Sequence, residues 1–353
     1  MEVLDYLVIG AGQQGLAFGK LVKDRGASVL ILEAREAPGA RWKEHYDSLV
    51  LFTPRRYSAL PGLLLPGAPH GYPTKNEFAE YLQTYARTFS LPVRTHTPVL
   101  ALTKDDAHFV ARTKDAVYTA RQVVVATGYG TPYIPAYAHT FEKHVVSLHS
   151  SSYKNEMQLP AGPLLVVGNG NSASQIAVEL ARSRNVDIAL LETPKVIAPT
   201  YLGISFYFWM NLFGFSRVSS QSFLGRLLAR EKDYVVGDAL LKALRSGHIH
   251  AQPGVAGTRD ARILFADGSE KEYGGVIWAT GFSQNLGWIH IPGALDERGA
   301  PHEHCGMSPI PGLAYLGLRN QFTPQSSNIV GVGDSARRVL AAFAAAPGTI
   351  GAA

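Results

Sequence analysis

The feature that most constrains the fold of this chain is a strand, glycine-rich turn and helix pattern that occurs twice in its 353 residues. The first copy runs from a β-rich apolar segment at Tyr6–Ile9 into GAGQQG, and the second runs from Leu164–Gly168 into GNGNSA. In both copies a helical stretch follows, and then an apolar strand that ends at a glutamate, Glu33 or Glu192. A later strand in each half ends in ATG. This repeat predicts an α/β fold with two parallel-sheet units rather than a short-period solenoid.

The three glycines of the first turn each meet a different requirement of a bound dinucleotide. Gly10 allows a tight turn after the strand, Gly12 lets the backbone approach a pyrophosphate, and Gly15 lets the helix pack closely on the strand. Glu33 lies 18 residues beyond Gly15, where a carboxylate can accept hydrogen bonds from ribose hydroxyls. The alternative is a glycine-rich turn without a ligand. The full strand–turn–helix–acid context favours a dinucleotide site.

The second turn carries the same signals, with alanine in place of the third glycine. Glu192 lies 19 residues beyond Ala173 and favours a free ribose 2′-hydroxyl, hence NADH. Lys195 is either a solvent-exposed loop lysine or a group that neutralises the 2′-phosphate of NADPH, and Arg182 and Arg184 are more distant candidates for that role. The sequence leaves the choice of coenzyme open, and an empty Rossmann-like unit is the alternative for the whole second copy.

Between the two copies the periodicity predicts further elements of the first unit. Apolar residues recur at helical spacing over Asn76–Arg87, with Thr74 or Asn76 as the N-cap. Segments 93–103, 107–112 and 116–126 alternate like strands of an antiparallel meander. The tail adds a strand from Leu313, a glycine turn at 331–333 and a helix from Ser335 to about residue 346. Because the tail resumes the first unit, we expect the second domain to be inserted in the first.

The composition excludes several classes of protein. With 46% hydrophobic and 17% charged residues the chain can bury a large core and is not disordered. The net charge of +5 comes without a Lys/Arg block, so we expect no nucleic-acid partner. Cys305 is the only cysteine, which excludes a disulfide framework, a Cys-x-x-Cys redox pair and a cysteine-rich metal site. His302–Cys305 is interpreted as a polar loop, and no metal site is expected.

The longest apolar and aromatic run is Tyr201–Phe215. At fifteen residues, with two glycines and an asparagine, it is shorter than the roughly 20 residues of a membrane-spanning helix. We therefore expect no membrane span and a cytoplasmic protein. The run is either a buried segment or a surface that lines a substrate channel, touches a membrane or joins subunits. A homo-oligomer formed through residues 201–215 is the partner expected from it, besides a small-molecule substrate and dioxygen.

At this point the chain resembles a known family. Its motifs are GAGQQG at 10–15, GARWKEHYDSLVLFTPRRYSALPG at 39–62, YPTKNEFAEYLQTYA at 72–86, VVVATG at 123–128, HSSSY at 149–153, VVGNGNSASQIAVEL at 166–180 and WATGF at 278–282. In this order they resemble compact bacterial flavoproteins related to class B flavin-containing monooxygenases and to plant YUCCA enzymes. The resemblance implies two Rossmann-like domains of the three-layer ββα type. It places FAD on residues 1–158 and 286–353, and NADPH or NADH on residues 159–285.

The resemblance also implies which residues hold each cofactor. The residues expected at FAD are Gly10, Gly12, Gln13, Gln14, Gly15, Glu33, Arg41, Trp42, Val99, Ala126, Thr127, Gly128 and Asp334. Those expected at the nicotinamide dinucleotide are Gly168, Gly170, Asn171, Ser172, Ala173, Glu192, Lys195, Ala279, Thr280 and Gly281. The two ATG segments would be the crossings between domains, and Asp334 would belong to a late turn over the flavin.

The chain departs from the family pattern in two places. In the fingerprint F-x-G-x-x-x-H-x-x-x-Y, Lys143 replaces the glycine and two extra residues precede His149, while His149 and Tyr153 keep their spacing. The absence of a Trp-Pro ending argues against a typical Baeyer–Villiger enzyme. Phe52 stands where many flavin monooxygenases have an asparagine, so Phe52 and Thr53 are the candidates for the flavin face and no catalytic side chain is assigned.

The function expected from the residues and the resemblance together is oxidation of a small organic or soft-nucleophile substrate. NAD(P)H would reduce bound FAD, and dioxygen would then supply one oxygen atom to the substrate. One alternative is a flavin reductase that passes electrons to a quinone or a protein without inserting oxygen. A second alternative is a non-enzymatic flavoprotein that senses redox state.

Overall fold

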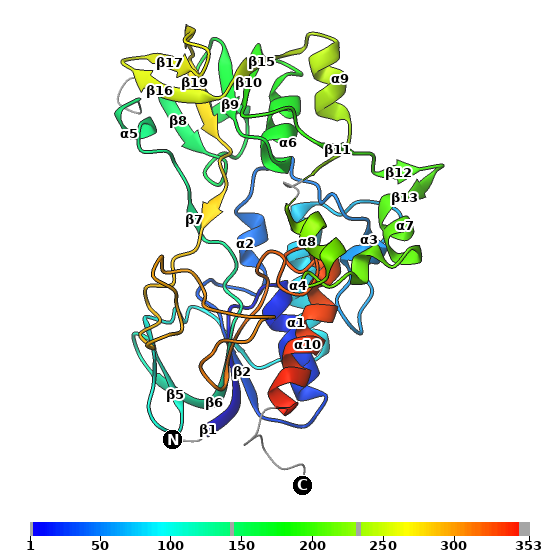
Figure 1. Cartoon of the computed structure of the whole chain (residues 1–353), viewed down its shortest axis with the longest axis vertical. Coiled ribbons are helices and arrows are strands. Elements are labelled where there is room, and N and C mark those ends of the chain that lie inside the picture. Colours follow the sequence, from blue (N-terminus) through cyan, green and yellow to red (C-terminus); the bar gives the residue numbers. More distant parts are fainter. Residues whose placement is uncertain (1–2, 142–144, 231–233, 346–353) are drawn as a thin grey trace.

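The computed structural model describes residues 3–141, 145–230 and 234–345, and these form two α/β units joined by two chain crossings (Figure 1). Residues 142–144, including Lys143 of the family fingerprint, lie outside the described residues. The elements of the first unit are β1 (Val3–Ile9), α1 (Gln13–Lys23), β2 (Val29–Leu32), α2 (Ala40–Lys43), α3 (Arg55–Ser58), α4 (Lys75–Thr88), β3 (Val93–Arg94), β4 (Ala101–Lys104), β5 (Phe109–Arg112), β6 (Val117–Val125), β21 (Leu313–Tyr315), the 3₁₀ helix η3 (Ile329–Gly331) and α10 (Val332–Ala345).

The second unit is built from the middle of the chain. Its elements are α5 (Ala138–Phe141), β8 (Val146–His149), η1 (Glu156–Gln158), β9 (Leu164–Val167), α6 (Asn171–Leu180), β10 (Val186–Leu190), α9 (Ala239–Arg245), β15 (Ile249–Pro253), β16 (Val255–Arg259), β17 (Arg262–Phe265), β18 (Glu270–Glu272) and β19 (Gly275–Trp278). The segment between β10 and α9 adds β11 (Val196–Ile197), β12 (Thr200–Tyr201), β13 (Ile204–Ser205), α7 (Phe206–Leu212), η2 (Phe215–Arg217), α8 (Phe223–Arg230) and β14 (Val235–Val236).

The first sheet has the strand order β3-β2-β1-β6-β5-β4, with β21 paired to β6. Strands β3, β2, β1, β6 and β21 are parallel, and β4, β5 and β6 form the predicted antiparallel meander. The prediction of one strand over 93–103 is wrong, because β3 pairs with β2 and only β4 joins the meander. His96 has a φ of 51° and Pro98 lacks a donor, and both interrupt a strand.

Helices α1, α4 and α10 cover one face of this sheet. Phe18 of α1 contacts Tyr6 and Phe343, with ring centroids 5.8 and 6.3 Å apart. The predicted helix over 76–87 is confirmed as α4, and Thr74 caps it: Glu77 N–H donates to Thr74 Oγ1 while Thr74 N–H donates to Glu77 Oε2. The tail helix α10 begins three residues before the predicted Ser335, because η3 continues directly into it without a separate glycine turn.

The second sheet has the order β15-β10-β9-β19-β8 with all strands parallel. Ile176 of α6 packs on one face with Val166 and Ile188. Ile263 and Phe265 of the β16–β18 sheet pack on the other face, which gives the predicted ββα layers. Sheet membership corrects the predicted boundary at residue 159, because β8 already pairs with β19. β8 precedes the glycine turn and has no motif of its own, so the sequence pattern does not assign this strand to the second unit.

The two crossings lie side by side between the units. β7 (Thr131–Pro132) follows the first ATG and pairs antiparallel with β20 (Phe282–Ser283), which follows the second. Figure 1 shows β7 between the two lobes. The chain then returns to the first sheet through β21, so the second domain is inserted in the first. Among the described helices, none has both the length and the apolar character needed to cross a bilayer.

Candidate dinucleotide and active site

The first glycine turn is shaped by contacts that only glycine permits. Gly10 has a φ of 107°, and a Cβ on it would lie 2.6 Å from the Ala126 carbonyl oxygen. A Cβ on Gly15 would lie 1.9 Å from the Gly10 carbonyl oxygen, so Gly15 brings α1 onto β1. A Cβ on Gly12 would meet nothing within 4 Å. The fold itself therefore requires Gly10 and Gly15, whereas the space at Gly12 is left open for a ligand.

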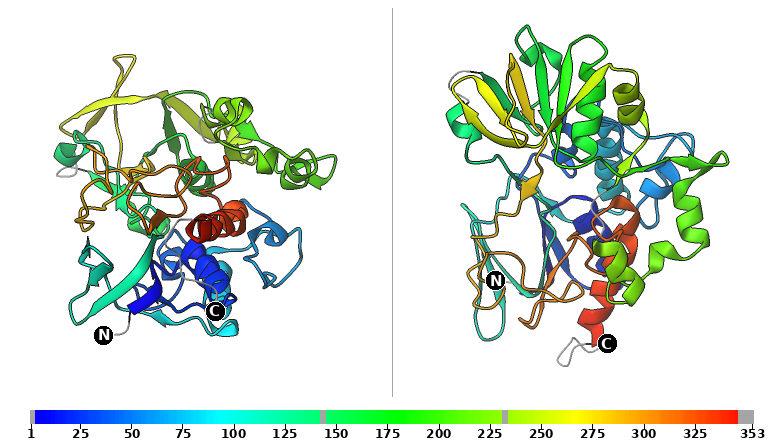
Figure 2. Two further views of the ribbon diagram at one scale, coloured as in Figure 1. Left: turned by 60° about the horizontal axis from the view of Figure 1, so that its bottom comes forward. Right: turned by 45° about the horizontal axis from the view of Figure 1, so that its top comes forward.

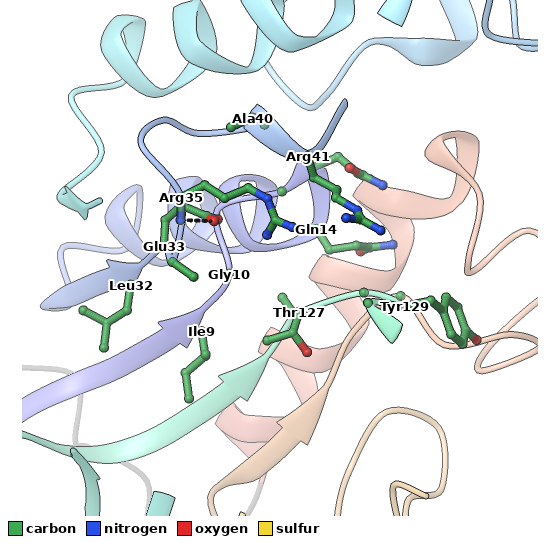
Figure 3. Close-up of a pocket in the computed structure, with 18 of the residues that line it drawn as sticks. Ile9, Gly10, Gln14, Leu32, Glu33, Arg35, Ala40, Arg41, Thr127 and Tyr129 are labelled. Carbon is green, nitrogen blue, oxygen red and sulfur yellow. Dashed lines mark hydrogen bonds between the residues drawn. The ribbon is translucent and has the colours of Figure 1, made fainter. Parts of the chain in front are cut away.

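That open space belongs to a cavity of about 410 Å³ at the carboxyl ends of β1, β2 and β6 (Figure 3). Of the residues predicted at FAD, those that line it are Gly10, Gly12, Gln13, Gln14, Glu33, Arg41, Trp42, Val99, Ala126, Thr127 and Gly128. Gly15 does not line the cavity and instead packs against the Gly10 carbonyl group of the turn. Asp334 is not among the lining residues, and its carboxylate pairs with Arg338 Nε of the same helix at 2.7 Å.

Other lining residues are absent from the predicted set. They include Arg35, His45, Tyr129, Phe282, Trp288, Gly317 and Ser327. Arg35 lies two residues after Glu33, so its closeness to the predicted strand-end carboxylate is a signal for it. Phe282 and Trp288 follow the second crossing, and Gly317 follows β21. Those residues reach the cavity only through the tertiary fold.

The charged groups at the cavity are held in place by hydrogen bonds. The Glu33 carboxylate accepts from the Ala11 N–H at 2.8 Å and from the Arg35 N–H at 2.9 Å, so its orientation is fixed at the end of β2. The guanidinium groups of Arg35 and Arg41 both pair with Glu44. Burial raises the pKa of Glu44, but the two arginines outweigh this and lower it overall. Figure 3 shows Arg35 and Arg41 on the opposite side of the cavity from Thr127.

The N-terminus of α1 offers donors that the protein itself does not use. Its N-cap, Gly12, has no side chain to accept from the first N–H groups, and the first turn carries no acid. Such an end binds anions such as phosphate. Gln14 Nε2 donates to the Ser326 carbonyl at 3.0 Å, while the buried Gln14 Oε1 has no partner within the described residues. The open glycine, the free helix end and this orphaned oxygen fit the pyrophosphate and adjoining groups of a dinucleotide.

The second glycine turn repeats this geometry. Gly168 has a φ of 146°, and a Cβ on it would lie 2.3 Å from the Ala279 carbonyl oxygen and 3.4 Å from Ala173 Cβ. A Cβ on Gly170 would meet nothing within 4 Å, and α6 also starts without a side-chain cap. Ala126 and Ala279 begin the two ATG segments, so each crossing packs on the first glycine of its own turn. This relation explains why the two motifs occur together in each half.

A second cavity, of about 230 Å³, joins the two turns. It shares Gln13, Trp42 and Ser327 with the first cavity. Asn171 and Ser172 from the second turn line it, as do the predicted flavin-face candidates Phe52 and Thr53. The remaining lining residues are Tyr46, Leu49, Val50, Leu51, Gln175, Asn328 and Ile329. The structure therefore places the candidate flavin face between the two dinucleotide turns.

The groups considered for coenzyme choice lie in different places. Asn169 Nδ2 donates to the Glu192 carbonyl at 2.6 Å and its Oδ1 accepts from the Leu191 N–H, which ties the glutamate to the glycine turn. Glu192 is exposed and follows β10 rather than ending it, and Lys195 is exposed just before β11. Arg184 donates to the carbonyls of Pro160 and Gly162, at the amino end of β9 and away from the turn.

His149 and Tyr153, the intact half of the family fingerprint, lie at the end of β8 and just after it, in the second unit beside the second crossing. His149 Nε2 lies 2.9 Å from the Gly281 carbonyl oxygen, and its ring packs edge-on against Phe282. Burial lowers the pKa of His149 and so favours the neutral form of the ring at the second crossing. Tyr153 is fully buried and donates to Glu179 Oε1 of α6 at 3.0 Å.

The loop at His302–Cys305 is held by backbone contacts. His302 Nδ1 lies 3.1 Å from the Gly293 carbonyl oxygen, and Glu303 accepts from the Gly306 N–H. No group of three or more His, Cys, Asp or Glu that could hold a metal ion occurs in the described part of the chain. Cys305 is half-buried against the core.

Comparison with known proteins identifies the family. The family model described as pyridine nucleotide-disulphide oxidoreductase matches residues 7–200. An uncharacterized CzcO-like oxidoreductase of Geobacillus kaustophilus is 41% identical over 340 residues, which are 96% of this chain and 98% of the relative. A probable indole-3-pyruvate monooxygenase of Arabidopsis thaliana, YUCCA1, is 28% identical over 84% of this chain and 80% of its own length.

Solved structures extend the similarity to the whole fold. A flavin-containing monooxygenase from Stenotrophomonas maltophilia superposes with a TM-score of 0.82 at 26% identity, covering 98% of this chain and 99% of that one. The bacillithiol disulfide reductase of Bacillus cereus shares the fold with a TM-score of 0.70 at 18% identity, covering 97% of this chain and 99% of that one. The chain therefore belongs to the pyridine nucleotide-disulphide oxidoreductase family, and it is an FAD-dependent oxidoreductase that uses a nicotinamide dinucleotide.

Proposed function

We propose that the protein is a flavin-dependent monooxygenase in which NADPH or NADH provides the electrons and a small organic or soft-nucleophile substrate receives one oxygen atom from dioxygen. The similarity to the Stenotrophomonas flavin-containing monooxygenase and to the plant YUCCA enzymes supports this activity. The chemistry that FAD supplies when bound is acceptance of a hydride and activation of dioxygen.

The first glycine turn would hold FAD in the 410 Å³ cavity. The N–H groups at the start of α1 and the nearby guanidinium of Arg41 would bind the pyrophosphate, and Glu33 would accept from a ribose hydroxyl. Trp42, whose Nε1 donates to Gln13 Oε1 at 3.2 Å, lines both cavities and would lie along the flavin.

The second turn would hold the nicotinamide coenzyme against the opposite end of the same space. Gly170 and the start of α6 would bind its pyrophosphate, with Ser172 beside the 230 Å³ cavity. That this cavity contacts both turns is the observation that carries the proposal, since hydride transfer requires the two rings to meet.

The walls of the second cavity favour an oxygenation step. Leu49, Leu51, Phe52 and Ile329 give it apolar sides, which would limit water beside a bound flavin and so protect the activated oxygen from premature decay. Thr53 contributes its hydroxyl to a hydrogen bond with Ser58 at 2.7 Å, so that polar group is already partnered inside the protein. The substrate class expected in such a space is small and largely apolar.

The reductase alternative rests on one specific observation. Phe52 occupies the position of the asparagine that many flavin monooxygenases carry near the flavin, and it lines the second cavity. A protein without that amide would pass electrons to a quinone or protein acceptor. Disulfide reduction, the chemistry named in the family description, needs a cysteine thiol at the flavin, and Cys305, the only cysteine, lines neither cavity.

Turnover of the purified holoprotein under ¹⁸O-labelled dioxygen tests the proposal. A panel of thioethers, amines and ketones is supplied with NADPH or NADH, and products are examined by mass spectrometry while peroxide is measured in parallel. Incorporation of one labelled atom into an organic product supports the monooxygenase. Steady coenzyme oxidation that reduces an added quinone without labelled product supports the reductase. Absence of steady coenzyme oxidation with every acceptor supports a sensing role.

A further inference from the structure

An exposed apolar surface lies outside both cavities, on the segment from β12 to α8. Large apolar side chains there are exposed to unusual extents, with Leu212 at 60%, Phe213 at 66% and Phe223 at 80%. The others on this surface are Tyr201, Leu202, Ile204, Phe208, Phe215, Leu224 and Leu227. We call these ten residues the aromatic surface. Exposed apolar clusters of this size mark a contact with another protein surface or with a membrane.

The segment carrying the aromatic surface stands at the edge of the molecule. Figures 1 and 2 show the β12–β13 hairpin and α7 projecting at the side of the molecule, away from the centre of the sheets. Its base is fixed: Tyr207 is buried against Tyr57 of α3, and the Ser220 N–H donates to the Phe322 carbonyl at 2.8 Å. The segment is therefore anchored to the first unit while its aromatic side chains face outward.

Helix α8 shows the direction of this surface most clearly. Gly225 is buried, and a Cβ on it would lie 1.8 Å from the Ser219 carbonyl oxygen, so the turn that precedes the helix covers this side of it. Phe223 and Leu227 are one turn apart on the outward side. Exposed Arg226 flanks them. An apolar stripe with a bordering cation is the arrangement of a helix that lies in a membrane interface.

A second copy of the chain and a lipid bilayer are the two partners that this surface could contact, and the charge of the segment discriminates between them. From Tyr201 to Leu227 the sequence contains Arg217 and Arg226 and no aspartate or glutamate. In a two-fold dimer the same surface meets itself, which would bring these like charges together without acidic partners from the segment. An anionic bilayer instead supplies the opposite charge over its whole area. Trp209, which stacks on Phe213 at 6.0 Å between centroids, belongs to the residue types enriched at bilayer interfaces.

We propose that the aromatic surface docks the protein on an anionic lipid bilayer, with Leu212, Phe213 and Phe223 inserted among the acyl chains and Arg217 and Arg226 at the headgroups. The protein lies on the bilayer and does not span it, in keeping with the short length of its apolar helices. The inference is independent of the substrate and of the oxygenation step.

Vesicle co-sedimentation of the FAD-loaded protein tests this proposal. The probes are phosphatidylcholine vesicles and phosphatidylcholine vesicles containing phosphatidylglycerol, at low and high salt. The expected result is at least tenfold stronger binding to the anionic vesicles, weakened by salt. The double variant Phe213→Ser/Phe223→Ser is expected to bind at least tenfold more weakly, and Arg217→Gln/Arg226→Gln to lose the preference for anionic lipid. FAD content and the thermal unfolding temperature confirm that each variant is folded.

Leu64→Ser is the matched control, because Leu64 is 82% exposed but lies outside the aromatic surface. It is expected to bind vesicles like the parent. Sedimentation velocity of the free protein completes the test. No vesicle binding, or equal weakening by Leu64→Ser, overturns the proposal. So does a stable dimer that the double variant dissociates while vesicles bind neither form, since the surface would then be a subunit contact.

Discussion

At the scale of single residues, the glycines of each turn divide into those that the fold needs and those that a ligand needs. Gly12 and Gly170 have open space at the Cβ position and φ values of −77° and −92°, which any residue adopts. Valine at either position keeps the fold but fills the space of the pyrophosphate. We expect Gly12→Val to abolish FAD binding, and Gly170→Val to leave a yellow protein that NAD(P)H no longer reduces. Visible absorbance and stopped-flow reduction measure the two outcomes.

Gly15→Val is the contrasting variant, because its side chain would collide with the Gly10 carbonyl and prevent folding. Loss of FAD from both the Gly12 and the Gly170 variants, in proteins that unfold at the parent temperature, would contradict two separate sites.

The histidine in the first cavity gives a pH dependence of stability. Burial, and after it the positive charges of Arg41, Lys154 and Lys75, lower the pKa of His45 from 6.5 to about 4. Between these values the unfolded chain binds a proton that the folded chain does not. The free energy of unfolding therefore falls as the pH falls from 6.5 to 4, by at most about 3 kcal/mol. In His45→Gln this part of the dependence should disappear in urea unfolding curves of the FAD-free protein.

His149, whose pKa burial also lowers, leaves a residual slope in that variant. His70 is exposed and lies outside the cavity, so His70→Gln serves as the control variant. Identical profiles for the parent and His45→Gln would show that the imidazole does not titrate in this window.

A prediction on coenzyme choice also concerns single residues. If Glu192 faces the ribose 2′ position, its charge repels the 2′-phosphate of NADPH, and Lys195 acts in the opposite sense. In an open, salt-screened site the effect should be about 1–2 kcal/mol, on the order of tenfold in specificity. We expect Glu192→Gln to shift the ratio of flavin-reduction efficiencies towards NADPH, and Lys195→Ala to shift it towards NADH. If both ratios stay at the parent value, Arg182 becomes the candidate for reading the 2′ position.

At the scale of elements, helix α6 is tied to the first unit by hydrogen bonds that orient the second turn. Glu179 accepts from Tyr153 Oη at 3.0 Å and also from the Ser48 hydroxyl, and Gln175 accepts from Tyr46 Oη at 2.9 Å. Tyr46 and Ser48 bridge the loop after α2 and the helix that begins at Asn171, whereas Tyr153 contacts Glu179 from within the second unit. Tyr46 and Ser48 therefore form a strut between the cofactor sites, and Tyr153, the aromatic half of the family fingerprint, holds Glu179 in place for it rather than acting as a reacting group.

Removing the strut should slow flavin reduction without removing FAD. Tyr153→Phe is expected to cost about 1–2 kcal/mol of stability and to lower the limiting rate of reduction on the order of tenfold, because the rings no longer meet in register. Tyr273→Phe is the matched control, since Tyr273 donates to the buried Asp187 at 2.7 Å within the second unit alone. A similar rate loss in both variants would point to general destabilisation rather than to orientation.

The elements with a local signature are also those that the sequence predicts correctly. Strand β1, helix α4 with its Thr74 cap and the two turns follow from short motifs that need no tertiary partner. The division of 93–103 into β3 and β4, and the membership of β8 in the second sheet, depend on which strand lies alongside, which periodicity does not report. For the same reason Glu33 and Arg41 were predicted in the first cavity, whereas Phe282, Trp288 and Ser327 were not.

At the scale of the whole molecule, the duplicated plan explains where the chemistry lies. In each unit the first glycine of the turn packs against the alanine that begins the crossing, Gly10 against Ala126 and Gly168 against Ala279. The two crossings pair with each other through β7 and β20. The turns thereby face a common space that neither unit encloses alone. Phe282, which lines the FAD cavity, contacts both His149 and the guanidinium of Arg41, and so couples the crossing to the first unit.

The reach of the first cavity determines which flavin the molecule retains. Its lining extends from Glu33, just after β2, and Val99, just before β4, to Tyr129 at the start of the first crossing. FMN would leave the Glu33 end without a ligand, so we expect the protein to purify with FAD. Added to FAD-free protein at about 100 times its dissociation constant, FAD should stabilise the fold by about 2.7 kcal/mol, and the same concentration of FMN by much less. Chromatography of the heat-released chromophore and thermal unfolding measure this, and equal stabilisation by FMN would place the adenosine outside the cavity.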